Sequence, residues 1–200
     1  MWYNIDMRKK THITLHNGKS VTLELTSDDY HFYITALDEN QMEVGKCQFN
    51  IEKMFKEQTK SNSFQRIVRL NVSLLDKYNA QGNTYTRDTG EVFCFDKTIT
   101  TLNSINILHA DYFKVGLGTA MLKEVEKLSR LYNASHIEGF YNPNGKFAHG
   151  AEKFYKNHSF IFDNKSIPNL TLITKPLQKI ATHSLVDTNQ KPHSNDNPNM

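Results

Sequence analysis

Residues 111–132, DYFKVGLGTAMLKEVEKLSRLY, restrict the folds open to this 200-residue chain more than any other stretch. Apolar side chains recur there at helical spacing, and Lys and Glu side chains occupy the opposite face. The apolar positions are Leu117, Met121, Val125, Leu128 and Tyr132. A strand-like segment over residues 105–110 comes first, and Gly116 and Gly118 lie at the junction. The stretch predicts a strand, a glycine turn and an amphipathic helix that packs on a sheet.

The segments on either side predict further strands. Residues 20–50 alternate between apolar and polar positions around turn-forming Asp and Asn residues, as antiparallel strands joined by a hairpin do. After the helix come a strand in SHIEGFYNP, a helix in GKFAHGAEKFYKNHSF, and strands in FIFD and LTLITKPL. A strand, helix and strand in succession imply parallel neighbours joined by a crossover. We therefore expect an α/β fold with a mixed, mainly antiparallel sheet flanked by helices.

Two regions are less regular. Residues 51–103 contain a short helical pattern in IEKMFKEQ, a strand-like QRIVRLNVSLL, a polar loop in NAQGNTYTRDTG and an apolar run in EVFCF, and their order in the fold stays open. Residues 183–200 are rich in Asn, Pro and other polar residues, so we expect a disordered tail there. Residues 1–182 have the length of a single domain.

Composition argues against several classes of function. The apolar runs are shorter than the roughly 20 residues of a membrane-spanning helix, and the N-terminus does not resemble a secretory signal, so we expect a cytoplasmic protein without a membrane partner. Cys47 and Cys94 are far apart in sequence, and the nine histidines form no HExxH pattern, so neither a disulfide framework nor a metal site is predicted. The net charge of +3 is spread along the chain, which does not indicate nucleic acid binding.

The glycine turn admits several interpretations. A kinase-type phosphate loop ends in Gly-Lys-Ser/Thr, but Thr119 and Ala120 follow Gly118 here, so that interpretation fails. A dinucleotide-binding loop, G-x-G-x-x-G/A, matches at its first two glycines and has Glu138 about 20 residues further on. Met121 at its third position is too bulky for the close helix packing of that fold. A tight turn without a ligand also stays open.

Two motifs resemble those of the Gcn5-related N-acetyltransferase (GNAT) family. FKVGLGTAML resembles the family's R/Q-x-x-G-x-G/A loop at both glycines, with Phe113 at the Arg/Gln position. AEKFYKNHSF, about 35 residues downstream, resembles A-x-x-F/L-Y-x-x-x-G-F, with Ser159 in place of the glycine. Its matched positions are Ala151, Phe154, Tyr155 and Phe160. The resemblance covers about residues 104–175 and implies an acyl-CoA N-acyltransferase (GNAT) fold.

The resemblance implies acetyl-CoA as co-substrate. Glycine lets the backbone approach an anion closely, and unsatisfied N–H groups at a helix N-terminus point at it, so the loop is expected to hold the pyrophosphate. The implied contacts are Lys114, Val115, Gly116, Leu117, Gly118 and Thr119. The strand residues implied to pair with the pantetheine arm are Leu108, His109 and Ala110. Residues 51–103 exceed the family's usual spacing, and an insertion there would be a natural place for substrate selection.

The resemblance also implies an enzyme that transfers acetyl to an amine of a small molecule, peptide or protein. Tyr155 matches the position that often protonates the leaving thiolate, and His109 and Glu138 are the candidate bases. Because Phe113 supplies no polar group, we expect weaker cofactor binding than is usual in the family.

Two other functions stay open. The first is a non-catalytic acyl-CoA-binding or interaction module with a degenerate GNAT fold. The second is a toxin-like acetyltransferase that acts on aminoacyl-tRNA. The sequence is also compatible with a homodimer and does not identify the acceptor.

Overall fold

The computed structural model describes residues 9–28, 31–57, 66–72, 80–81, 83–145, 148–167 and 169–177. The expected disordered tail, residues 183–200, lies outside these ranges. Within them, the strands form one mixed sheet whose main path runs β1-β2-β3-β4-β8-β9-β11-β10. Every neighbouring pair on this path is antiparallel except β8 and β9, which are parallel. The predicted mixed, mainly antiparallel sheet is therefore confirmed.

The first half of the chain forms a meander of hairpins. The strands are β1 (Lys9–Thr14), β2 (Ser20–Ser27), β3 (Phe32–Leu37) and β4 (Glu43–Glu57). β2 and β3 alternate strictly between buried and partly exposed residues, because one face of the sheet is covered. β1 was not predicted. Its side chains in KKTHIT are exposed or only partly buried, so this edge strand lacks the apolar alternation that marks its neighbours.

β4 corrects the helix predicted in IEKMFKEQ. Its residues 51–57 are instead the far half of a 15-residue strand that pairs with β8 (Val92–Ile107) and with β5 (Ile67–Asn71). A bulge between Met54 and Phe55 shifts the register, so these two adjacent residues are both buried. Together with Ile51 they mimic the i, i+3, i+4 pattern of a helix.

β8 likewise unites an apolar run, whose place in the fold the sequence left open, with a predicted strand. It includes the apolar run EVFCF and the start of the strand expected over residues 105–110, and it ends at Ile107. The end of β4 and the start of β8 contribute to a second apolar cluster with β5 and β7 (Thr84–Thr86), and β7 also pairs with β6 (Ala80–Gln81). Its buried members are Phe55, Leu70 and Phe93. The region called an insertion thus begins and ends inside two long strands, and the single-domain assignment stays a prediction.

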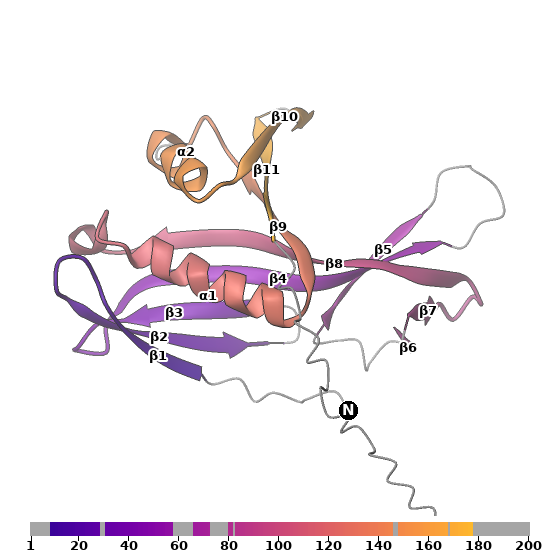
Figure 1. Cartoon of the computed structure of the whole chain (residues 1–200), viewed down its shortest axis with the longest axis horizontal. Helices are drawn as coiled ribbons and strands as arrows, with labels where there is room; N and C mark the ends of the chain where they lie inside the picture. Colours follow the sequence, from indigo (N-terminus) through magenta and orange to yellow (C-terminus); the bar gives the residue numbers. More distant parts are fainter. Residues whose placement is uncertain are drawn as a thin grey trace, which may run out of the picture.

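Two helices cover one face of the sheet. α1 (Leu117–Leu131) lies across β4 and β8, and it buries the predicted stripe of Leu117, Met121, Val125 and Leu128 in the main core (Figure 1). β9 (Ala134–Tyr141) follows, then α2 (Ala148–Asn157), β10 (Ile161–Ile167) and β11 (Leu170–Pro176). α2 packs its partly buried residues against the same core, so both helices lie on one side. No helix covers the other face among the described residues.

Candidate active site

The parallel strands β8 and β9 separate part of the way along their length. Their pairing ends at Leu102 opposite Gly139. Beyond this point β8 continues beside β4, to Ile107 opposite Gly45, and β9 continues beside β11, to Tyr141 opposite Thr171. Figure 1 shows β9 and β11 turning away from β8. Beyond this point the facing edges of the two strands are not paired with each other, and we call the divergence between them the wedge.

Gly139 permits β8 and β9 to approach each other closely at the closed end of the wedge, where their pairing stops. A Cβ atom added to it would lie 2.9 Å from the carbonyl oxygen of Leu102, closer than real Cβ atoms approach backbone oxygen. Any larger residue would therefore push the strands apart before the point where they now separate. Sequence reasoning missed this role, although a glycine inside a strand pattern was a signal for it.

The glycine turn lies at the start of α1, as predicted. Gly116 has φ 96° and caps the helix, a left-handed conformation that favours glycine. The six backbone N–H groups from Lys114 to Thr119 donate no hydrogen bond to any described residue. Their free donors and the positive end of the helix dipole suit an anion. Phe113 is 48% exposed, so its ring points to solvent beside the turn.

Two histidines flank the turn. The His16 N–H donates to the Val115 carbonyl at 3.1 Å, and the His16 ring lies 3.2 Å from where a Cβ atom of Gly116 would be. On the other side, His158 Nε2 lies 3.0 Å from the Thr119 hydroxyl. Burial lowers the pKa of His158, and the nearby Lys175 lowers it further. His158 therefore favours the neutral form, in which its ring nitrogen can hydrogen-bond Thr119.

α2 positions Tyr155 beside the sheet. Neighbouring Phe154 reaches the first turn of α1, where its ring lies 3.3 Å from a Cβ atom built on Gly118. The Tyr155 ring packs edge-on against Phe154 and Phe160. Burial, with a smaller contribution from the Cys47 thiol, raises the pKa of Tyr155 to about 12. The hydroxyl therefore stays protonated at neutral pH and makes no hydrogen bond with another described residue.

Glu138 lies on the other face of the sheet. It pairs with Thr101 of β8, one step before the strands separate, and Arg69 Nη1 lies 2.7 Å from its carboxylate. The His136 and Arg69 side chains hold its pKa below the ordinary value, and this outweighs the opposing effect of burial. A carboxylate with a lowered pKa is a weaker base than an ordinary glutamate. The ion pair of Glu138 with Arg69 of β5 joins residues that are 69 positions apart, and no sequence pattern predicted it.

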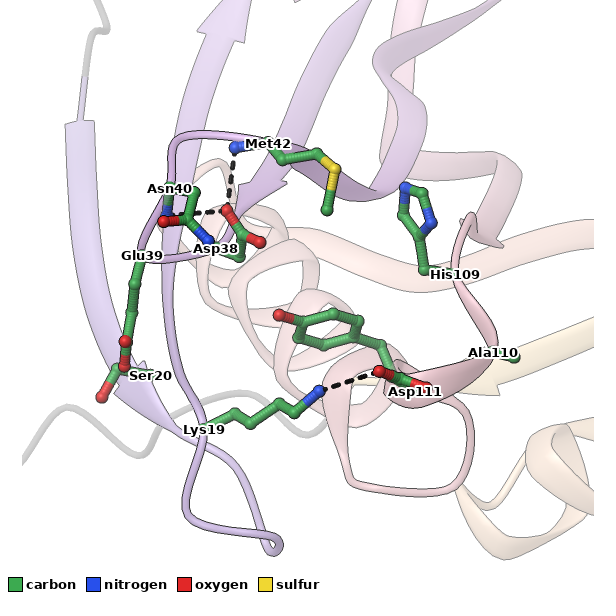
Figure 2. A pocket seen from close by; sticks show the side chains of 10 residues that line it. Lys19, Ser20, Asp38, Glu39, Asn40, Met42, His109, Ala110 and Asp111 are labelled. Atoms are coloured by element: carbon green, nitrogen blue, oxygen red, sulfur yellow. Dashed lines mark hydrogen bonds and ion pairs between the residues drawn. The ribbon is translucent and has the colours of Figure 1, made fainter.

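His109 lies elsewhere. The predicted strand over residues 105–110 ends at Ile107, so Leu108 and His109 form a connection and Ala110 is the first residue of the short 3₁₀ helix η2 (Ala110–Tyr112). The Leu108 N–H donates to the Val44 carbonyl and is thus occupied on the β4 side. The exposed His109 lines a separate hollow of about 460 Å³ with Lys19 and Asp111, which form an ion pair (Figure 2). Neither Tyr155 nor Glu138 lines that hollow.

The turn before α2 has a structural role. Asn142 accepts a hydrogen bond from the Asn144 N–H through its side chain, at 2.9 Å, and its carbonyl accepts one from the Gly145 N–H. Ala148 is the first residue of α2, and its carbonyl accepts a hydrogen bond from the Tyr141 hydroxyl. Among the described residues, no cluster of three or more His, Cys, Asp or Glu side chains is set to hold a metal ion. No described helix is long and apolar enough to span a bilayer.

No family model and no curated protein match this sequence. Solved structures do match its fold. The GNAT domain of S. lividans PAT is 7% identical, with a TM-score of 0.52 over 88% of this chain and 100% of that domain. Arabidopsis thaliana NAA60, solved with a bisubstrate analogue, is 16% identical over 76% of this chain and 79% of its own, with a TM-score of 0.44.

A GNAT-family acetyltransferase of Streptococcus pneumoniae is 14% identical over 76% of this chain and 70% of its own, with a TM-score of 0.42. At such identities the similarity concerns the backbone arrangement and does not extend to substrates. The match to the S. lividans domain extends over most of this chain and over the whole of that domain. This chain therefore has the GNAT acyltransferase fold.

Proposed function

We propose that this protein transfers the acetyl group of acetyl-CoA to a primary amine. The observation that carries the proposal is the wedge between β8 and β9 together with the nearby glycine turn, whose six N–H groups donate to no described residue. An extended thioester arm fits between two unpaired strand edges, and a pyrophosphate fits at the turn. The turn is part of the first motif that resembles the GNAT family.

The chain's own groups fit the charge of this co-substrate. Backbone N–H groups from Lys114 to Thr119 bind phosphate oxygens without needing a side chain at Phe113. The exposed His16 and Lys114 side chains add cationic or donor groups at the rim of the turn. In this proposal the turn has shifted part of its phosphate recognition from the missing Arg or Gln side chain to the backbone and to His16 of the β1–β2 loop.

The reaction is an acyl transfer. The neutral amine nitrogen attacks the thioester carbonyl carbon, a C–N bond forms, and the C–S bond breaks as the tetrahedral intermediate collapses. The thiolate then takes a proton, and the nitrogen loses one to water or to a base. In this proposal, backbone N–H groups on the strand edges beyond Leu102 and Gly139, where β8 and β9 no longer pair, stabilise the oxyanion, which is usually the largest electrostatic contribution to acyl transfer.

Tyr155 is the proposed proton donor to the thiolate. Its raised pKa keeps it protonated, and its hydroxyl has no partner among the described residues that would compete. Glu138 fits a charge-bearing role toward the amine better than that of a base, because its pKa is lowered. His109 as a base stays a prediction with less support, since it lies in the separate hollow of Figure 2.

Calorimetric titration with acetyl-CoA, followed by a thiol-release assay with a panel of primary amines and aminoacyl-tRNA, tests the proposal. We expect micromolar binding and release of thiol that depends on the amine. Absence of binding at millimolar acetyl-CoA would overturn the proposal. Binding without turnover on any acceptor would favour the non-catalytic acyl-CoA-binding module, and turnover on aminoacyl-tRNA alone would favour the toxin-like acetyltransferase. Titration with desulfo-CoA is the control that separates recognition of the phosphates from recognition of the thioester.

A further inference from the structure

The proposed acetyl transfer does not identify the amine acceptor. The side chains on the sheet face opposite α1 indicate which amines fit. On β9, Ile137 and Tyr141 are buried toward the helices, whereas Glu138 and Phe140 point to the other face. Phe140 directly follows Gly139, the last residue paired with β8, and it is 53% exposed. A carboxylate and an aromatic ring therefore flank the closed end of the wedge on the face that the helices leave free.

Charge on this face favours a cation. Arg69 lies 2.7 Å from Glu138 and 3.9 Å from Glu52, so one guanidinium serves two carboxylates. The Thr101 hydroxyl donates to the Glu52 carboxylate at 3.0 Å. The Glu138 side chain is only 15% exposed, which reduces screening of its charge by solvent. Glu138, Glu52 and Arg69 together carry one net negative charge, and the His136 ring also contacts Glu138, with Nε2 3.4 Å from the carboxylate.

The neighbouring surface carries apolar side chains, and the exposed Asp163 of β10 lies beyond them, paired across the strands with Leu172. Phe140 pairs across the strands with Leu172 of β11, and the side chains of cross-strand partners lie on the same face. Leu170, two residues before Leu172, is also exposed on this face. Side chains at i and i+2 of a strand stand about 7 Å apart. The ring of Phe140 therefore lies within a distance that a few covalent bonds of a ligand would span from an ammonium held at Glu138. A ligand that satisfies both groups needs its apolar part close to its nitrogen.

From this juxtaposition we infer that the acceptor is a monoamine with a large apolar group on the carbon next to the nitrogen, as in a free α-amine of a leucine or phenylalanine unit. The inference rests on the proposed acetyl transfer. Its ammonium binds beside Glu138 and loses a proton to solvent before attack, and its apolar group covers Phe140. A polyamine would place a second charge on the apolar surface, and a hydroxylated amine would leave the ring exposed.

The test compares acceptors that differ only in this group, with the full-length chain and saturating acetyl-CoA. Leucinamide and phenethylamine are the apolar acceptors, serinamide and ethanolamine are their polar counterparts, and spermidine is the polycation. We expect kcat/KM from thiol release to favour each apolar acceptor by about tenfold or more. Phe140→Ser should reduce that preference to about threefold or less without changing the Kd of acetyl-CoA.

Leu131→Ser is the matched control, because Leu131 is 67% exposed at the end of α1 and makes no contact with the opposite face. It should leave the preference unchanged. Glu138→Gln should raise KM for all amines while the Kd of acetyl-CoA stays constant. Equal or better turnover of serinamide or spermidine, or a preference that survives Phe140→Ser, overturns this inference alone. Failure to bind acetyl-CoA overturns the proposed function and the inference with it.

Discussion

The glycine turn offers the sharpest quantitative test, through substitution of Gly116 by alanine. Gly116 has φ 96°, so an alanine there adopts the left-handed region at a cost of about 1–2 kcal/mol. Its Cβ atom would also meet the His16 ring at 3.2 Å, and His16 is held by the hydrogen bond from its N–H to Val115. We expect Gly116→Ala to lower the free energy of unfolding by about 2 kcal/mol, since both effects act together.

Two other glycines separate these contributions. Gly90 has φ 84° with nothing within 4 Å of an added Cβ atom, so Gly90→Ala reports conformational strain alone, about 1 kcal/mol. Gly118 lies in the first turn of α1 without a positive φ, so alanine there improves helix propensity by up to about 1 kcal/mol. The 3.3 Å contact with Phe154 opposes that gain, and Gly118→Ala should change stability by less than about 1 kcal/mol.

Urea unfolding measures the change in stability of each glycine variant, and calorimetric titration measures its Kd for acetyl-CoA. If the turn binds the pyrophosphate, Gly116→Ala should weaken the Kd by about tenfold or more, equivalent to about 1.4 kcal/mol, because it displaces the N–H groups. Gly118→Ala should stay within about threefold of the wild type. A Gly116→Ala protein that binds acetyl-CoA with unchanged Kd would refute the phosphate-binding role of the turn. Equal free energies of unfolding for Gly116→Ala and Gly118→Ala would refute the argument that the left-handed conformation of Gly116 makes alanine costly there.

Three further outcomes follow from named contacts. Tyr155→Phe should lower kcat by about 100-fold and leave the Kd of acetyl-CoA unchanged, as thiol release and calorimetry would show; a loss of binding instead would contradict a role as proton donor. The folded-state pKa of Tyr155 is raised from 10.0 to about 12, so its contribution to stability is complete below pH 10 and is lost as the pH rises toward 12. Over that interval the wild type should lose unfolding free energy more steeply than Tyr155→Phe, and parallel curves would show that the tyrosine is not buried. Ser129→Ala leaves the buried Thr100 hydroxyl without its acceptor and should cost about 1–3 kcal/mol in urea unfolding, whereas Thr100→Val should cost less, because the Ser129 hydroxyl keeps its bond to the Val125 carbonyl.

The elements with an undisturbed period were predictable from sequence. α1 shows a full apolar stripe and was predicted, as were the hairpin strands β2 and β3 with their strict alternation. β4 was misread at IEKMFKEQ because a bulge at Phe55 breaks the period of two and leaves a false helical pattern. β1 was missed because an exposed edge strand needs no apolar alternation.

Some residues of the candidate site were likewise predictable from sequence, and others were not. Gly116 and Tyr155 stand in local motifs, and the structure brings the turn and α2 together through Phe154 against Gly118. The ion pair of Glu138 with Arg69 and the close approach at Gly139 depend on strand pairing between distant segments. Such contacts follow from tertiary register, which a single sequence does not reveal.

β4 and β8 run through two separate apolar clusters, one beneath α1 and one around Phe55, Leu70 and Phe93. The second cluster has few buried members and no covering helix among the described residues, so its local opening exposes little apolar surface and costs little free energy. Amide protons of the same strand should therefore exchange with solvent at two rates, fast near Phe93 and at the rate of global unfolding near Ile105. One continuous strand would thus belong to two cooperative units, and the wedge would lie in the more slowly exchanging one.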